Sequence, residues 1–235
     1  ALRKNQRLLE NRAVWLDSEV KKATAEIKLR EKETILRLSR AADSRDPETG
    51  AHILRMANYS RLIAANLGLS DEQQQMVLDA APMHDIGKVG IPDHILLKPG
   101  KLTPEEFAIM KTHARLGYQI LAGSQSEIVQ SGAEIALVHH EKYDGSGYPQ
   151  GLRGTEIPLF ARIVAVADVF DALTSERPYK SAWPIDKAVA FLREGAGQHF
   201  DPQCVDAFLS DWDKVVEIRE RYQDEANSVD GLGLY

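Results

Sequence analysis

Residues 1–45 carry the pattern of a long amphipathic helix, with neither glycine nor proline. Apolar side chains recur in two interleaved series of period seven, with charges between them: Leu2, Leu9, Leu16 and Ala23, and Ala13, Val20 and Ile27. This spacing is typical of a coiled-coil seam, although three polar residues fall on it: Gln6, Arg30 and Thr34. We expect a coiled-coil connector helix over 1–45 that joins two copies of the chain in parallel. Packing of this helix on its own domain is the alternative.

A second unit over 46–235 follows the break at Asp46-Pro47, because the residue before proline avoids helical backbone. Apolar periodicity and helix-start signals predict about seven helices there, at 50–67, 70–85, from 103 onward, and at 126–141, 158–174, 184–194 and 202–222. Only 148–158 predicts a small hairpin or an open loop, and no run of alternating strands occurs. The sequence therefore predicts an all-α protein, a helical bundle preceded by the long helix.

Charge and composition narrow the function. Residues 1–40 have a local charge of +5, whereas residues 41–235 have a local charge of −11. An acidic body argues against a nucleic-acid polymer as partner, and it repels phosphate substrates unless bound metal ions reverse the sign. The single cysteine, Cys204, fits a reducing compartment, and no apolar run is long enough to insert into a membrane. The start resembles no signal peptide, so we expect a cytoplasmic piece cut from a longer chain.

Histidines and carboxylates stand at intervals of about one helix. His84-Asp85 and His139-His140 form adjacent pairs, while three further candidates stand apart: His52, His113 and Asp168. Each lies on or beside a different predicted helix, so a bundle can bring all of them into one core. Glu48, four residues before His52, would share a helix face with it. Two other histidines match no ligand pattern and are expected to be structural: His94 and His199.

Metal binding explains this set of residues best. Five histidines and three carboxylates are too many for one ion, so we expect two or three divalent ions. Mixed nitrogen and oxygen ligands without thiolate favour Fe or Mn, with Zn, Ni or Co as alternatives. Two such ions about 3.5–4 Å apart can activate a water and clamp a phosphoryl oxygen.

Three segments carry a family resemblance: H-D-I-G-K (84–88), H-H-E-K-Y-D-G-S-G-Y-P (139–149) and A-D-V-F-D-A-L-T-S-E-R-P-Y-K (167–180). Through them the chain resembles the HD-GYP domains, the subclass of the HD metal-dependent phosphohydrolase superfamily that degrades cyclic di-GMP. The resemblance covers about residues 35–215 and implies the HD-superfamily helical bundle. The long first helix also resembles the connector that joins a receiver domain to such a domain in response regulators.

The resemblance also implies roles for individual residues. The metal ligands would be Glu48, His52, His84, Asp85, His113, His139, His140 and Asp168. Asp85 would bridge two ions, and Glu48 would permit a third. Asp85 and Lys88 would act in catalysis, with Lys88 facing the phosphate or the leaving oxygen. The residues expected to contact the substrate are Lys88, Tyr148, Asp171, Arg177 and Lys180.

The function expected from this resemblance is hydrolysis of cyclic di-GMP to pGpG, with GMP as the product of a slower second cleavage. One alternative is a signalling module that binds cyclic di-GMP, or docks a diguanylate cyclase through the loop around 147–149, with little turnover. A nucleotidase acting on mononucleotides is a third hypothesis, against which the 139–149 motif argues. The complete set of ligands favours the enzyme.

Overall fold

The computed structural model describes residues 2–45, 50–176 and 181–223, with backbone alone for 2–4 and 6–10. These residues confirm the all-α prediction, because their only β-structure is one isolated bridge between Ala196 and Phe200. The segment 148–158 is an open loop with a short 3-10 turn, η3 (Gly154–Glu156). None of the described helices combines the length and the apolar character that crossing a membrane requires.

The body contains more helices than the seven expected. In the described part of the chain they are α2 (Gly50–Asn66), α3 (Asp71–Ala80), α4 (Asp93–Leu96), α5 (Pro104–Met110), α6 (Thr112–Leu121), α7 (Glu127–Val138), α8 (Leu159–Thr174), α9 (Ile185–Glu194), α10 (Pro202–Leu209) and α11 (Trp212–Arg221), with 3-10 turns η1 (Ala81–Met83) and η2 (Ile86–Gly90). The helix expected over 70–85 ends at Ala80, because Pro82 enters a 3-10 turn. The segment 202–222 divides at Asp211, whose backbone is not helical.

Capping residues mark several helix starts, as the sequence predicted. Ser70 and Gln73 form a capping box at α3, and Thr103 and Glu106 form another at α5. In each box the hydroxyl of the capping residue accepts from the backbone amide three residues later. The side chain of that later residue accepts from the backbone amide of the capping residue, so two amides that would otherwise lack an acceptor are satisfied. Asp201 caps α10 through the amide of Gln203. These local contacts explain why the starts could be read from the sequence.

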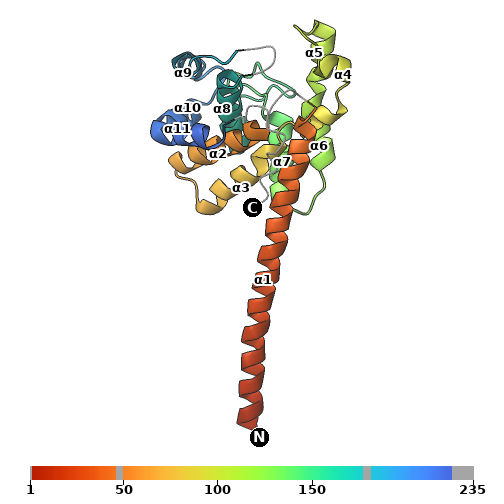
Figure 1. Cartoon of the computed structure of the whole chain (residues 1–235), viewed down its shortest axis with the longest axis vertical. Helices are drawn as coiled ribbons and strands as arrows, with labels where there is room; N and C mark the ends of the chain where they lie inside the picture. Colours follow the sequence, from red (N-terminus) through yellow and green to blue (C-terminus); the bar gives the residue numbers. More distant parts are fainter. Residues whose placement is uncertain (1, 46–49, 177–180, 224–235) are drawn as a thin grey trace.

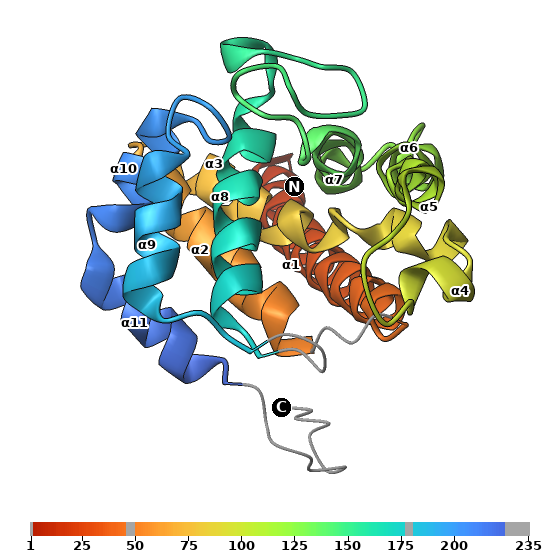
Figure 2. The ribbon, with the colours of Figure 1, turned by 90° about the horizontal axis from the view of Figure 1, so that it is seen from above.

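Helices α2 and α8 form the centre of the body (Figure 2). Three aromatic residues, all fully buried, join α2, α8 and α10: Tyr59, Phe170 and Phe208. Their rings meet edge to face at centroid distances of 4.8–5.5 Å, the preferred geometry of aromatic pairs. Because α2 and α8 carry His52 and Asp168, this packing gives two candidate ligands rigid supports.

The long helix α1 (Leu2–Asp43) projects from the body (Figure 1). At 1.5 Å per residue it is ~63 Å long. Only its C-terminal part packs against the body, through Ile35, Ser39 and Ala42, whereas residues 11–30 are exposed. The predicted seam residues in that stretch, Leu16 and Ile27, are 47% and 66% exposed. The expected seam positions Leu2 and Leu9 have side chains outside the described part.

Polar contacts fasten the end of α1 to the body. Arg45, just beyond the helix, donates to the carbonyl oxygens of Val89 and Ile91 and pairs with Asp93 at 2.6 Å. Lys32 pairs with Asp79 of α3 at 2.7 Å. The last turns of α1 are therefore held to both α3 and the segment that includes η2.

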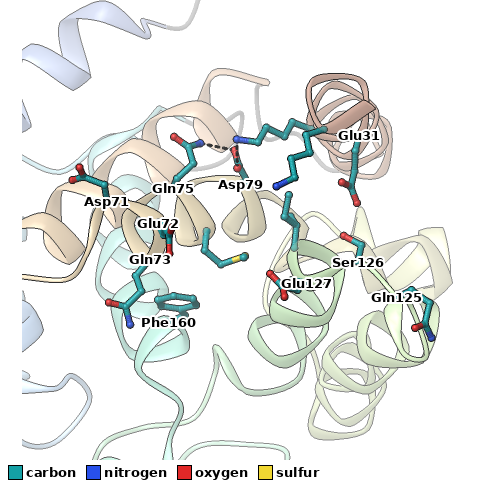
Figure 3. A pocket seen from close by; sticks show the side chains of 14 residues that line it. Glu31, Asp71, Glu72, Gln73, Gln75, Asp79, Gln125, Ser126, Glu127 and Phe160 are labelled. Carbon is teal, nitrogen blue, oxygen red and sulfur yellow. Dashed lines mark hydrogen bonds and ion pairs between the residues drawn. The ribbon is translucent and has the colours of Figure 1, made fainter. Parts of the chain in front are cut away.

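A wide groove of about 980 Å³ lies where α1 leaves the body, between α1, α3 and α7 (Figure 3). Charged side chains from α1 and α3 line part of it, and Met76, Ile128 and Phe160 are apolar. Asp79 accepts from both Lys32 and Gln75 at one side of the groove. None of the described His and Asp candidates lines it, so the candidate metal chemistry is elsewhere.

Candidate metal centre

The fold brings together every ligand candidate that lies in the described residues. Their ligand atoms form two groups, each with all atoms within 4.8 Å of one another. One group is Asp85, His113, His139 and His140, and the other is His52, His84 and Asp168. Glu48 lies outside the described residues, so the third-metal position stays a prediction. His94 and His199 belong to neither group, as expected.

Backbone carbonyls orient three of these histidines. The Nδ1 atoms of His84, His113 and His139 lie 2.7–3.1 Å from carbonyl oxygens of the preceding turn. A carbonyl only accepts, so Nδ1 carries a hydrogen, and in the neutral imidazole Nε2 keeps its lone pair. Each Nε2 lies 3.2–3.4 Å from an oxygen of Asp85. The three lone pairs therefore converge on one carboxylate.

These convergent atoms have no hydrogen-bond partner. Nε2 of His84, His113 and His139 and Oδ1 of Asp85 are all buried and unsatisfied. Burial of a polar atom without a partner costs free energy, and native proteins rarely leave such atoms in a cluster. A cation among them accepts all four lone pairs at once. The residues present therefore fit divalent metal ions.

The electrostatics of the cluster agree with this fit. Burial lowers the pKa of His139 and His140, so both imidazoles are neutral at pH 7 and available as ligands. Burial alone would raise the pKa of Asp85, but Lys88 and His84 outweigh it and hold that pKa well below its usual value. Asp85 is therefore a carboxylate at neutral pH, which is the form that binds metal.

Lys88 lies beside the bridging candidate. Its Nζ is 2.9 Å from Oδ2 of Asp85, and its side chain is only 12% exposed. Gly87, between these two residues in sequence, packs against α6 so closely that a Cβ would stand 1.9 Å from the carbonyl oxygen of His113. The glycine of H-D-I-G-K thus permits the close approach that holds Asp85 and Lys88 against His113.

Asp171, expected to contact the substrate, is buried behind His52. Its side chain is 1% exposed; one oxygen accepts from Nδ1 of His52 at 2.7 Å, and Arg55 Nε and Nη2 donate to both oxygens. Burial alone raises the pKa of Asp171, but His52 and Arg55 hold it below its usual value. Asp171 is therefore placed to orient the candidate ligand His52, as carboxylates behind ligating histidines do, and its expected contact with the substrate stays a prediction.

Sequence reasoning missed Arg55. It is 3% exposed and joins Asp171 to Ser175 and to the carbonyl oxygen of Tyr222. An arginine three residues after His52 lies on nearly the same helix face, which is a signal that could have identified it. Buried arginine is rare without a carboxylate partner, so Arg55 predicts an acidic residue behind His52.

The loop after His140 is folded around a buried carboxylate. Glu141 is 2% exposed and accepts from the amides of Gln150, Gly151 and Leu152 at 2.6–3.1 Å. The amide of Tyr148 donates to the carbonyl oxygen of His140, and the two rings lie 4.8 Å apart. Sequence reasoning selected Tyr148 but missed Glu141, although an acid directly after two histidines in the 139–149 motif was a usable signal.

Two expected phosphate ligands, Arg177 and Lys180, lie outside the described residues. Their assignment to the substrate stays a prediction. Asp168, whose side chain is 18% exposed, and His140, which is partly buried, are the more accessible members of the two ligand groups. Together with Tyr148 and Lys88, they mark the side from which a substrate reaches the cluster.

Comparisons with known proteins agree with this geometry. Residues 36–204 match the HD domain family. The chain is 53% identical over 208 residues to the cyclic di-GMP phosphodiesterase response regulator RpfG of Xanthomonas campestris pv. campestris (strain 8004), covering 88% of this chain and 55% of that protein. It is 45% identical over 193 residues to the 3'3'-cGAMP-specific phosphodiesterase 2 of Vibrio cholerae, covering 82% of this chain and 37% of that protein. The chain thus spans about half or less of these relatives.

A solved structure supports the fold independently. An HDG"Y"P protein from Bdellovibrio bacteriovorus superposes with a TM-score of 0.55 at 24% identity, covering 69% of this chain and 51% of that chain. At this identity the likeness shows the fold alone. The resemblance found in the sequence is confirmed by the family match, which spans all the described residues of both ligand groups. The chain belongs to the HD domain family.

Proposed function

We propose that this chain is a metal-dependent phosphodiesterase that hydrolyses cyclic di-GMP to pGpG, with GMP as the product of a slower second cleavage. The observation that carries the proposal is the convergence of three histidine Nε2 atoms and Asp85 Oδ1, all buried and unsatisfied. The name of the Xanthomonas relative supports cyclic di-GMP as the substrate. The ring of Tyr148 lies against that of His140, which supports the placement of a planar nucleotide base beside the cluster.

The ligand set suits two ions, one at each group, and Glu48 would add a third. Nitrogen and oxygen donors without thiolate favour Fe or Mn over Zn, Ni or Co. Such ions, when bound, supply a water that acts as nucleophile near neutral pH and a positive charge for the phosphoryl oxygens. The protein supplies the orientation: carbonyls fix His84, His113 and His139, and Asp171 fixes His52.

Asp85 and Lys88 have separate tasks in this proposal. Oδ2 of Asp85 faces His84 of one group, and Oδ1 faces His113 and His139 of the other, so the carboxylate can serve both ions. Lys88 donates from Nζ to Asp85. The same ammonium has further hydrogens to donate to a phosphoryl oxygen or to the departing 3′-oxygen. Arg177 and Lys180 would neutralise the remaining phosphate charge.

One experiment separates turnover from binding. The protein is purified anaerobically, its metal content is measured, and cyclic di-GMP is incubated with protein loaded with Mn or Fe. We expect about two or more metal ions per chain, with release of pGpG that stops on chelation and resumes when metal is restored. Tight nucleotide binding without product in the fully loaded protein would contradict the enzyme and support the signalling module.

We also propose a parallel homodimer through α1. On a helix with 3.6 residues per turn, the seam residues Leu16, Val20 and Ile27 are rotated by roughly 70° from the body-facing Ile35 and Ala42. The seam is therefore not covered by the chain's own body, and its residues in this stretch are exposed. An identical helix is the partner that buries such a stripe along its whole length.

The division at residue 45 into connector and catalytic domain is part of the same proposal. Helix α1 ends at Asp43, two residues before that boundary, and the family match begins at residue 36. The relative from Xanthomonas is named a response regulator, which supports a receiver domain upstream of α1 as the source of the signal.

A further inference from the structure

An aromatic and cationic corner lies beside the metal centre, formed by Phe107 of α5, Lys111 between α5 and α6, and Tyr148. The rings of Phe107 and Tyr148 meet edge to face with centroids 6.2 Å apart. The Nζ of Lys111 lies 5.3 Å from the centre of the Phe107 ring and 5.8 Å from that of Tyr148. Three side chains from two segments that are far apart in the sequence therefore lie next to one another.

This corner adjoins the ligand cluster. Tyr148 packs on the ring of His140 at 4.8 Å, and the ring of His113 lies 5.0 Å from His140. A substrate with a phosphate at the cluster would extend over this corner.

Phe107 is held in place although it is exposed. Its ring is 46% exposed, but the first turn of α5 is fixed by the Thr103–Glu106 capping box and by Lys98, which pairs with Glu106 at 2.6 Å. A rigid, exposed aromatic ring is a suitable stacking surface, because little conformational entropy is lost when a ligand covers it.

Lys111 forms no ion pair with a carboxylate in the described part of the chain, and its ammonium lies over the two rings. The acidic residue nearest in sequence, Glu106, accepts hydrogen bonds from Lys98 and from the amide of Thr103. The donors of Lys111 are thus available to a ligand that lies against the rings.

We propose that Phe107 and Lys111, with Tyr148, form a recognition site for one guanine base of a cyclic dinucleotide. The base lies against the rings of Phe107 and Tyr148, and Lys111 donates to its O6 and N7. This inference rests on the proposed function, because it places the phosphate of the same substrate at the cluster.

The chemistry of the corner makes it selective. Guanine presents two acceptors, O6 and N7, side by side, which is the edge that lysine recognises. Adenine presents a donor, its N6 amino group, where guanine has O6. A lysine at this position therefore favours guanine, so dinucleotides with at least one guanine should be accepted and cyclic di-AMP should be disfavoured.

The test compares steady-state kinetics of cyclic di-GMP and cyclic di-AMP on the Mn-loaded chain. Lys111→Met keeps an apolar stem but removes the donors, so KM for cyclic di-GMP should rise about 10-fold while that for cyclic di-AMP changes less than about 2-fold. Phe107→Ala removes stacking that every base shares, so both KM values should rise about 5- to 50-fold. Lys101→Met, an exposed lysine just before α5, is the matched control and should behave as the unmodified chain.

Three results would overturn the inference. Equal losses for both dinucleotides in Lys111→Met would make Lys111 a phosphate contact rather than a base contact. Unchanged KM values in Lys111→Met would remove it from the site. An unmodified chain without preference for cyclic di-GMP would exclude selection of guanine. If the Mn-loaded chain turns over neither dinucleotide, the proposed function fails, and calorimetric binding of the two nucleotides then tests the recognition site alone.

Discussion

His52 donates its Nδ1 hydrogen to Asp171, 2.7 Å away in a helix more than 100 residues further along the chain. The same carboxylate is held by two nitrogens of Arg55, so the imidazole cannot rotate without breaking a buried ion pair. Its Nε2 is thereby directed toward Asp168, 3.6 Å away. A carboxylate outside both candidate ligand groups thus sets the direction of His52, a member of one of them.

Replacing Asp171 tests this orientation. Asp171→Asn replaces one carboxylate oxygen with an NH2 group, which donates and cannot accept. The side chain then cannot accept from both His52 and Arg55 as the carboxylate does. We expect metal affinity at the His52 group to fall about 10- to 100-fold, measured by Mn titration in a calorimeter. Asp206→Asn, at an exposed position of α10, is the control. A variant with the affinity and KM of the unmodified chain would show that His52 needs no such support.

Asp85 is predicted to serve both ligand groups at once. Asp85→Ala should lower the metal content and abolish turnover of cyclic di-GMP together, because each of its oxygens faces a different group. Elemental analysis and product chromatography on the same preparation measure both effects. Retention of full metal content with at least half of the rate would show that Asp85 does not bridge.

Metal binding should release protons because of His84. Burial lowers the pKa of this imidazole, but Asp85 and Asp168 outweigh burial and raise the pKa to about 10 in the metal-free protein. His84 is therefore charged at pH 7.5 and must lose its proton to bind metal, so affinity should rise with pH up to about 10. Its charged form stabilises the metal-free fold fully below pH 6.5, and this contribution is lost as the pH rises through about 10.

Calorimetry of Mn binding in buffers with different ionisation enthalpies counts the protons released by His84. At pH 7.5 we expect about one proton per chain from this residue. An apparent enthalpy that does not depend on the buffer would contradict the prediction.

The exposed seam of α1 predicts a dimer that should dissociate when lysines are introduced on the seam. Leu16→Lys combined with Val20→Lys puts like charges on adjacent seam positions, so the chain should become monomeric in light scattering at micromolar concentration. Its metal content should not change, because residues 11–30 do not contact the body. Val14→Lys, 72% exposed on a different face of the same helix, is the control and should leave the dimer intact. A monomeric unmodified chain would defeat the proposal.

Local signals in the sequence predicted the parts of this structure that depend on neighbouring residues. The capping boxes at Ser70 and Thr103 need contacts across three residues only. The candidate ligands were recognisable because they stand singly or in adjacent pairs on successive predicted helices. The contacts of Asp171 could not be predicted in this way, because its partners His52 and Arg55 are 119 and 116 residues away. No local pattern determines which of two carboxylates on α8, Asp168 or Asp171, faces the metal. That choice is made by the packing of α2 against α8.

Helix interruptions were missed for a similar reason. The periodic pattern over 202–222 continues across Asp211, but the chain bends there so that both Phe208 and Val215 reach the core. Periodicity alone records which residues are apolar and does not record a change of helix axis.

The contact of Arg45 with the body has a mechanical consequence. Its guanidinium donates to carbonyl oxygens in and next to η2 and also pairs with the Asp93 side chain. On the other side of the turn, Gly87 touches the backbone of α6 and leaves no free space. The turn that carries Lys88 is thus clamped between the end of α1 and the helix of His113. A movement of α1, whose far end is ~63 Å away, can therefore reach this turn through Arg45 as well as through the packed residue Ile35.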